Sequence, residues 1–148
     1  MTSPRLAVRA LIVEEGRLLL VNAYPDGRSD LWCAPGGGVE AGCDLASNLC
    51  REVHEETGLS VEIGGLALVN EFHNPDTGFH QVELFFRARV TGGTIDPAWR
   101  DPDAIVTERR FFAPAELSAV RFKPDSLPAI AFGPVPEARY DPLERMVV

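Results

Sequence analysis

Three glutamates, Glu52, Glu55 and Glu56, lie within five consecutive positions of the sequence. On an α-helix each residue advances by about 100° around the axis, so their carboxylates would share an arc of about 100°. Like charges packed this closely repel one another, and a lower dielectric increases the repulsion. Arg51 can pair with Glu55, four residues later, but one arginine cannot neutralise three carboxylates. A divalent cation with oxygen ligands, such as Mg²⁺, can do so. The spacing therefore favours a metal site along one helix edge.

A helix over residues 44–57 is expected to position these carboxylates. Asp44 is suited to cap its N-terminus, and Gly58 stands where a left-handed residue ends a helix. On the helical wheel the apolar stripe lies next to the glutamates and consists of Ala46, Leu49, Cys50 and Val53. The carboxylates are therefore expected to border the buried face of the helix.

Strands are expected on both sides of this helix. Residues 6–13 and 17–23 are rich in Val, Leu and Ile and are joined by a tight turn at Glu14-Glu15-Gly16. Further strands are expected over residues 31–34, 61–72, 81–90 and 107–113. Pro35 and the three glycines after it are expected to break regular structure. Such alternation indicates one mixed α/β domain spanning residues 1–148.

The last third of the chain is less regular. A short helix is expected to begin at residues 114–117, and another over residues 125–132, where Pro128 fits only the first turn. Residues 133–148 are interpreted as an extended tail. Its last three residues are expected to dock on the body of the protein or on a partner chain, and a homodimer is one such arrangement.

Composition excludes several classes of partner. The chain has 148 residues, with 14 Lys and Arg against 22 Asp and Glu, and a net charge of −8. This balance argues against binding to nucleic acid polymers or anionic membranes, although a bound cation still permits an anionic small substrate. No apolar run approaches the roughly 20 residues of a membrane span, and no signal peptide is recognised. Cys33, Cys43 and Cys50 form no CxxC pair and are expected as reduced, buried thiols in a cytoplasmic protein.

Residues 37–59 resemble the signature of the Nudix hydrolase family. The matching positions are Gly37, Arg51, Glu52, Val53, Glu55, Glu56, Gly58 and Leu59. With ordinary residue frequencies, an accidental match at one starting position is on the order of one in ten million. The resemblance implies an α/β/α sandwich with a mixed β-sheet.

The resemblance also implies a reaction. Proteins of this family hydrolyse the pyrophosphate bond of a nucleoside diphosphate linked to another group, X, with Mg²⁺ or Mn²⁺. By motif position, the metal ligands would be Glu52, Glu55, Glu56 and the backbone carbonyl of Gly36. Arg51 would orient Glu55 or another carboxylate. The general base is expected to be Glu52 or, alternatively, Glu108 in the late strand.

One position departs from the signature, because Cys43 stands where the family has its first glutamate. That glutamate usually buttresses the motif through the arginine, a role that Asp44 could partly assume. A nucleotide-binding sensor or scaffold with little or no catalysis is therefore the alternative function. Tyr24, Trp32, Phe72 and Phe79 are candidates for stacking on a base, Arg9 and Arg28 for binding phosphate, and His73 and His80 for lining the pocket.

Overall fold

The structure is a computed structural model that describes residues 3–134 and 137–148. Its elements are β1 (Arg5–Glu14), β2 (Arg17–Asn22), β3 (Leu31–Cys33), β4 (Gly36–Gly38), α1 (Leu45–Thr57), β5 (Ser60–Asn74), β6 (Phe79–Gly92), β7 (Arg109–Phe112), α2 (Pro114–Leu117), β8 (Arg121–Phe122), α3 (Leu127–Phe132), β9 (Arg139–Tyr140) and β10 (Glu144–Arg145). No helix in these two ranges is long and apolar enough to cross a membrane.

The strands form one mixed, curled sheet with β1 near its centre. Its order is β10-β5-β6-β1-β2-β3-β8, with β4 paired to β1, β7 to β2 and β9 to β5. Strand β1 runs parallel to β6 and antiparallel to β2 and β4. The expected α/β fold with a mixed sheet is thereby confirmed.

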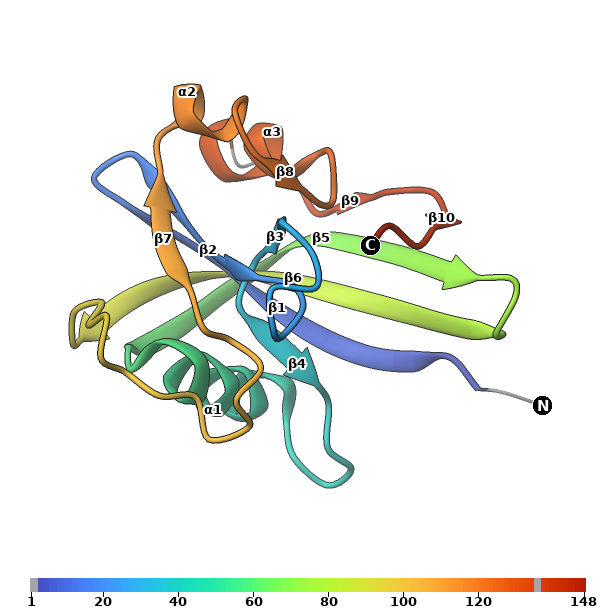
Figure 1. Cartoon of the computed structure of the whole chain (residues 1–148), viewed down its shortest axis with the longest axis horizontal. Coiled ribbons are helices and arrows are strands. Elements are labelled where there is room, and N and C mark those ends of the chain that lie inside the picture. Colours follow the sequence, from blue (N-terminus) through green and yellow to red (C-terminus); the bar gives the residue numbers. More distant parts are fainter. Residues whose placement is uncertain (1–2, 135–136) are drawn as a thin grey trace.

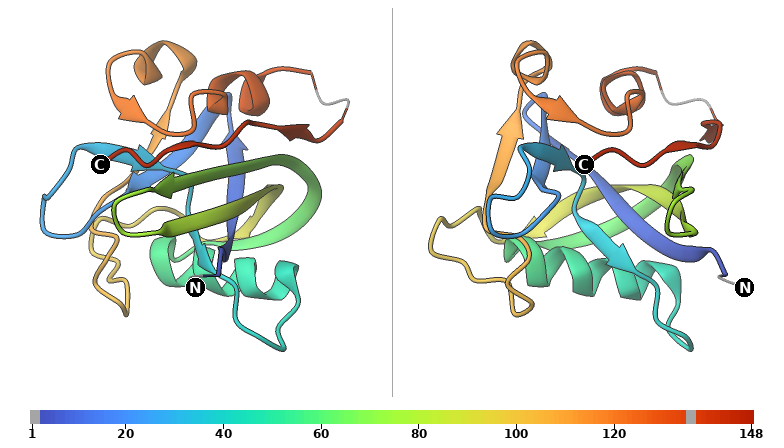
Figure 2. Two further views of the ribbon diagram at one scale, coloured as in Figure 1. Left: turned by 90° about the vertical axis from the view of Figure 1, so that its right-hand side faces the viewer. Right: turned by 45° about the vertical axis from the view of Figure 1, so that its right-hand side comes forward.

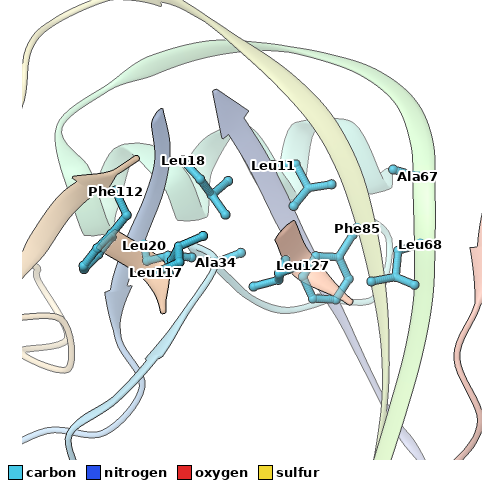
Figure 3. Packing of buried hydrophobic residues seen from close by; sticks show 10 residues of the cluster. All are labelled: Leu11, Leu18, Leu20, Ala34, Ala67, Leu68, Phe85, Phe112, Leu117 and Leu127. Atoms are coloured by element: carbon cyan, nitrogen blue, oxygen red, sulfur yellow. The ribbon is translucent and has the colours of Figure 1, made fainter. Parts of the chain in front are cut away.

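Helices cover both faces of the sheet, with α1 on one side and α2 and α3 on the other (Figure 1). Leu49 and Val53 of α1 pack on Val8, Leu19 and their neighbours. The opposite core contains Leu11, Leu18, Leu20, Phe112, Leu117 and Leu127 (Figure 3). Successive strand residues point to opposite faces. Because both faces are covered, β1 and β2 are apolar almost throughout, which explains the two runs that predicted them.

Helix α1 begins and ends where its cap residues predict. The Asp44 carboxylate accepts a hydrogen bond from the Ser47 backbone N–H at 2.9 Å. Gly58, with φ 76°, donates its N–H to the His54 carbonyl. The apolar stripe is narrower than predicted, because Leu49 and Val53 are buried whereas Ala46 is exposed.

Two segments that were expected to be irregular pair with the sheet. Residues 36–38 do not break the structure but form β4 against β1. In the tail, β9 and β10 pair in parallel with β5, so the tail docks on the body of the protein (Figure 2). Residues 1–2 and, within the predicted tail, residues 135–136 lie outside the described ranges. Both differences arise because ladder hydrogen bonds to distant strands override local propensity.

The three cysteines are free thiols, but the expectation that they are buried is wrong. Each is partly exposed. Cys33 lies in β3 at the edge of a cavity, and Cys43 lies in the turn before α1. Cys50 is on the flank of α1, beside the narrower apolar stripe. Cysteine is among the most often buried residue types, but this general tendency does not determine the exposure of an individual cysteine in a turn or at a cavity edge.

Candidate active site

Strand β4 and helix α1 enclose two of the predicted carboxylates. The Gly36 N–H points at Glu56, 3.4 Å from both carboxylate oxygens, and Glu56 is only 8% exposed. A Cβ atom at Gly37 would lie 2.6 Å from the nearest Glu52 carboxylate oxygen, so a side chain there would displace that carboxylate. Gly36, Gly37, Glu52 and Glu56 line one cavity of about 250 Å³, here called the carboxylate cavity.

Asn48 fastens the chain after β4 to helix α1. Its side chain is fully buried, accepts a hydrogen bond from the Glu40 N–H at 2.9 Å and donates one to the Gly38 carbonyl at 3.1 Å. These bonds satisfy backbone groups that would otherwise be buried without partners. Sequence reasoning missed this residue. On the helical wheel it falls among the glutamates, four residues before Glu52, so the predicted apolar stripe did not include it.

Arg51 lies among three carboxylates, as its place in the signature suggests. It contacts Glu55 at 3.2 Å, Glu52 at 3.5 Å and Glu40 at 3.3 Å. The idea that Asp44 assumes the role of the family's missing glutamate is not supported, because the Asp44 carboxylate caps α1. Glu40 is instead the additional acid beside Arg51. The pairing depends on the path of the turn before α1 and was not visible in the sequence.

Burial determines the protonation of the enclosed carboxylates. Burial raises the pKa of Glu56 from its ordinary 4.5 to about 8, although the charge of Arg9 opposes the shift. The pKa of Glu52 is also raised, mainly by burial, with Arg51 opposing the shift. A nearby cation would favour the charged forms of both groups. Without one, the site holds a proton on Glu56 at neutral pH.

The long loop between β6 and β7 docks on the C-terminal end of α1. Trp99 donates its indole N–H to the Glu55 carbonyl at 2.8 Å, and Arg109 donates a hydrogen bond to the Glu56 carbonyl. These are carbonyls that a helix end leaves without intrahelical partners. At Gly58, a Cβ atom would come within 2.9 Å of the Trp99 ring. The last glycine of the signature therefore both ends the helix and makes room for the loop.

The docked loop places two aspartates, Asp101 and Asp103, on the wall of the carboxylate cavity. Asp101 is buried, and its carboxylate accepts hydrogen bonds from the backbone N–H groups of residues 103, 105 and 106. Asp103 is exposed, and its charge contributes to the raised pKa of Glu52. Sequence analysis treated this segment only as a Pro- and Asp-rich loop, because nothing local indicated where it folds back.

A second cavity, of about 200 Å³, adjoins the first and is here called the aromatic cavity. Tyr24, Phe72 and Phe79, which the sequence offered as candidates for stacking on a base, line it. Arg5, Arg9, Ala23 and Cys33 line both cavities. Burial lowers the pKa of Arg9, but the negative groups around it, with Glu83 at 2.8 Å the strongest, together outweigh this, so the net pKa is raised and Arg9 stays charged. Although Cys33 is partly exposed to the cavities, the surrounding protein desolvates its thiol and raises the pKa to about 12, so the thiol is neutral.

Other predicted site residues lie elsewhere. Glu55 pairs with Arg51 and is not among the described residues that line the carboxylate cavity. Glu108 is exposed in the loop immediately before β7 and, with Trp32, lines a third cavity. Arg28 lies over the Tyr24 ring at 4.6 Å. His80 contacts Glu71 at 2.8 Å, and its ring centroid is 6.5 Å from that of His73.

The carboxylate cavity offers oxygen ligands of the kind that a divalent cation requires. Within residues 3–134 and 137–148, no three Asp, Glu, His or Cys side chains converge into a complete metal site. Mg²⁺, however, commonly uses one or two protein carboxylates and completes its shell with water and substrate phosphates. Glu52, Glu56 and the Gly36 carbonyl are hard oxygen donors around one cavity. This set fits a magnesium ion held jointly by protein and substrate.

The raised pKa of Glu56 leads to a prediction about stability without metal. Folded and unfolded states bind this proton with pKa values of about 8 and 4.5, so the stabilising contribution is complete below pH 4.5 and is lost as the pH rises through 8. The melting temperature of chelator-treated protein should therefore fall between pH 6 and pH 9. Mg²⁺ should reverse this fall at pH 9.

The control is Glu56→Gln, which resembles the protonated side chain in shape and charge. Its melting temperature should fall less over the same pH interval and should respond less to Mg²⁺. Equal pH dependence in the two proteins would contradict the assignment of the shift to Glu56.

Comparison with known proteins identifies the family. The family model described as the NUDIX domain matches residues 3–132. A MutT-like protein of Streptomyces ambofaciens is 35% identical over 131 residues, which cover 81% of this chain and 77% of that protein. An ADP-ribose pyrophosphatase of Methanocaldococcus jannaschii is 29% identical over 92 residues, or 62% of this chain and 54% of its own length. A Bacillus subtilis relative is matched over 44% of its length.

The fold comparison agrees. The crystal structure of an ADP-ribose pyrophosphatase from Streptococcus suis superposes with a TM-score of 0.70 at 24% identity, covering 94% of this chain and all of that one. The structure of a Nudix hydrolase from Nitrosomonas europaea also superposes with a TM-score of 0.70, and the match covers 84% of each chain. At this identity the likeness shows the shared fold. The signature, the match over residues 3–132 and the Streptomyces relative together establish that the chain belongs to the NUDIX domain family.

Proposed function

We propose that the protein hydrolyses the pyrophosphate bond of a nucleoside diphosphate linked to another group, with Mg²⁺ or Mn²⁺ as cofactor. The observation that carries the proposal is the placement of Glu52 and Glu56 in a cavity that shares Arg5 and Arg9 with an aromatic cavity. One cavity offers carboxylates for a metal ion, and the other offers aromatic surface for a base. The names of the archaeal and streptococcal relatives support ADP-ribose as the first substrate to test.

Different residues are proposed to bind the diphosphate and the metal ion. Arg5 and Arg9, at the junction of the cavities, would bind the diphosphate, because guanidinium groups form charge-assisted hydrogen bonds with phosphate oxygens. Glu52, Glu56 and the Gly36 carbonyl would hold the cation. A bound Mg²⁺ supplies charge neutralisation on the non-bridging oxygens and a water of lowered pKa. Arg51 orients Glu52 and Glu55 on the surface of α1.

The general base is proposed among the acids at the carboxylate cavity. Glu52 was the first candidate from the sequence, and it lines this cavity. Asp103 is a second, because it lines the same cavity and is exposed to solvent, whereas the Asp101 carboxylate is engaged with backbone N–H groups. Glu108 lines a different cavity, so the geometry favours the other two.

Hydrolysis of a substrate panel tests the proposal. ADP-ribose, UDP-sugars, dinucleoside polyphosphates and nucleoside triphosphates would be supplied with Mg²⁺ or Mn²⁺, and products would be separated by chromatography. We expect a mononucleotide and a phosphorylated product from at least one compound. Glu56→Gln should lower kcat/KM by about 10²-fold or more, because it removes charge from the site.

The matched control is Glu62→Gln, since Glu62 is exposed on β5 and pairs with Arg89 away from both cavities. It should leave kcat/KM nearly unchanged. Nucleotide binding without any product would reject hydrolysis and favour the sensor or scaffold function, for which the cysteine at position 43 is the main argument.

The general base is distinguished by its effect on the pH profile of the best substrate. Asp103→Asn or Glu52→Gln should lower kcat by about 10²-fold and remove the acidic limb of the profile if that residue abstracts the proton. Glu108→Gln should change kcat by less than about threefold, because Glu108 lines a different cavity from the one that holds Glu52 and Glu56. A Glu108→Gln variant with the largest loss would contradict the proposed placement of the reaction.

A further inference from the structure

The aromatic cavity has a wall that comes from outside the matched family domain. Glu144, Arg145, Met146 and Val147 line it. The NUDIX match ends at residue 132, before β9 and β10. The tail runs beside β5 in both views of Figure 2. A segment that the family domain does not include therefore shapes one side of this cavity.

The tail is anchored at several points, so its position over the cavity is defined. The Met146 N–H donates to the His73 carbonyl at 2.8 Å, which continues the pairing of β10 with β5. Lys123 contacts Glu144 at 3.3 Å. Burial lowers the pKa of Lys123, but the hydrogen bonds and charges of Asp125 and Glu144 together outweigh this, so the net pKa of Lys123 is raised.

Two further bonds hold the end of the tail, one of them from a residue that lines the cavity. The Tyr24 hydroxyl donates to the Val147 carbonyl at 3.1 Å, and Arg121 donates to the Val148 carbonyl at 3.1 Å. Tyr24 itself lines the cavity. The tail therefore bridges β5 and the loop after β2, and the cavity lies beneath this bridge.

The chemistry of the cavity suits a flat, largely apolar group with a charged end. Phe72 and Phe79 lie with ring centroids 6.1 Å apart, and Met146 and Val147 add aliphatic surface. Asn70, which is buried, places an amide on the same wall. Aromatic side chains stack on every type of nucleobase, and side-chain amides form hydrogen bonds with base edges. Arg5 and Arg9 line both cavities, so they can reach the phosphate of a nucleotide whose base occupies the aromatic cavity.

We propose that the tail forms one wall of a nucleobase-binding site in the aromatic cavity and thereby helps to select the nucleotide. The two cavities together fall within the range of about 300–1,000 Å³ typical of small-molecule sites. This inference deepens the proposed function by assigning a position to the base. It rests on the proposed function only for the direction in which the nucleotide lies, with its phosphates toward the carboxylate cavity. Met146 and Val147 are assigned as specificity-determining residues.

Binding of nucleoside monophosphates tests this separately from hydrolysis, because these compounds contain no pyrophosphate bond. Calorimetric titrations would use AMP, GMP, CMP and UMP, with and without Mg²⁺, on the full chain. We expect at least one to bind with a Kd of about 1 mM or lower. Met146→Ala should weaken the best ligand at least fivefold and reduce the difference between the best and worst ligands.

The design includes a matched control and a check on folding. Leu143→Ala removes an exposed side chain from the same segment that does not line the aromatic cavity, and should leave all four affinities within about twofold of wild type. Met146→Ala keeps the backbone bond to His73, so a folded tail is expected even if deletion of residues 144–148 destabilises the protein. Melting temperatures verify that each variant is folded.

The outcomes separate the two proposals. Binding of no monophosphate, or affinities unchanged in Met146→Ala, would overturn the role of the tail even in an active hydrolase. Tail-dependent binding by a protein that hydrolyses none of the panel would support the nucleobase site and reject the proposed hydrolysis.

Discussion

Nearly complete burial of the Glu56 carboxylate is the constraint on which the rest of the site depends. A buried charge is costly unless it is paired and hydrogen-bonded. Here the direct contact is the Gly36 N–H, at 3.4 Å. The group therefore either keeps a proton, as the pKa of about 8 indicates, or requires a cation beside it. The neighbouring structure maintains this condition: β4 lacks side chains, Asn48 holds the chain after β4, and the loop before β7 closes the end of α1.

Electrostatics also explain how an acidic protein can receive an anionic substrate. The chain carries a net charge of −8, yet Arg5 and Arg9 lie where the two cavities meet. Arg9 is held by Glu83, and Arg5 donates to Gln81 on the neighbouring strand β6 at 2.5 Å. The parallel pairing of β1 with β6 places these groups side by side. Positive charge is thus positioned by the sheet, next to acids positioned by the helix.

Local features of the sequence predicted the helix, its two caps and the edge on which the glutamates lie. Those predictions succeeded because each depends on residues within a few positions of one another. Glu40, Asn48 and Asp103 were missed because their roles depend on how a turn and a long loop return to α1. The tail strands were missed for the same reason, since their pairing partner, β5, lies about 70 residues earlier in the chain. The predicted metal-ligand role of Glu55 relied on the motif and that of Glu108 as a base on strand order, and neither residue lines the cavity that holds Glu52 and Glu56.

The central claim is that a divalent cation binds between α1 and β4. Anomalous diffraction from crystals soaked in Mn²⁺, recorded with and without a nucleoside monophosphate, locates the ion directly. We expect a peak within about 2.5 Å of a Glu56 or Glu52 carboxylate oxygen and close to the Gly36 carbonyl. The same soak of Glu56→Gln crystals should give a much weaker peak. A Mn²⁺ peak found only at exposed acids outside the carboxylate cavity, or no peak at saturating Mn²⁺, would contradict it.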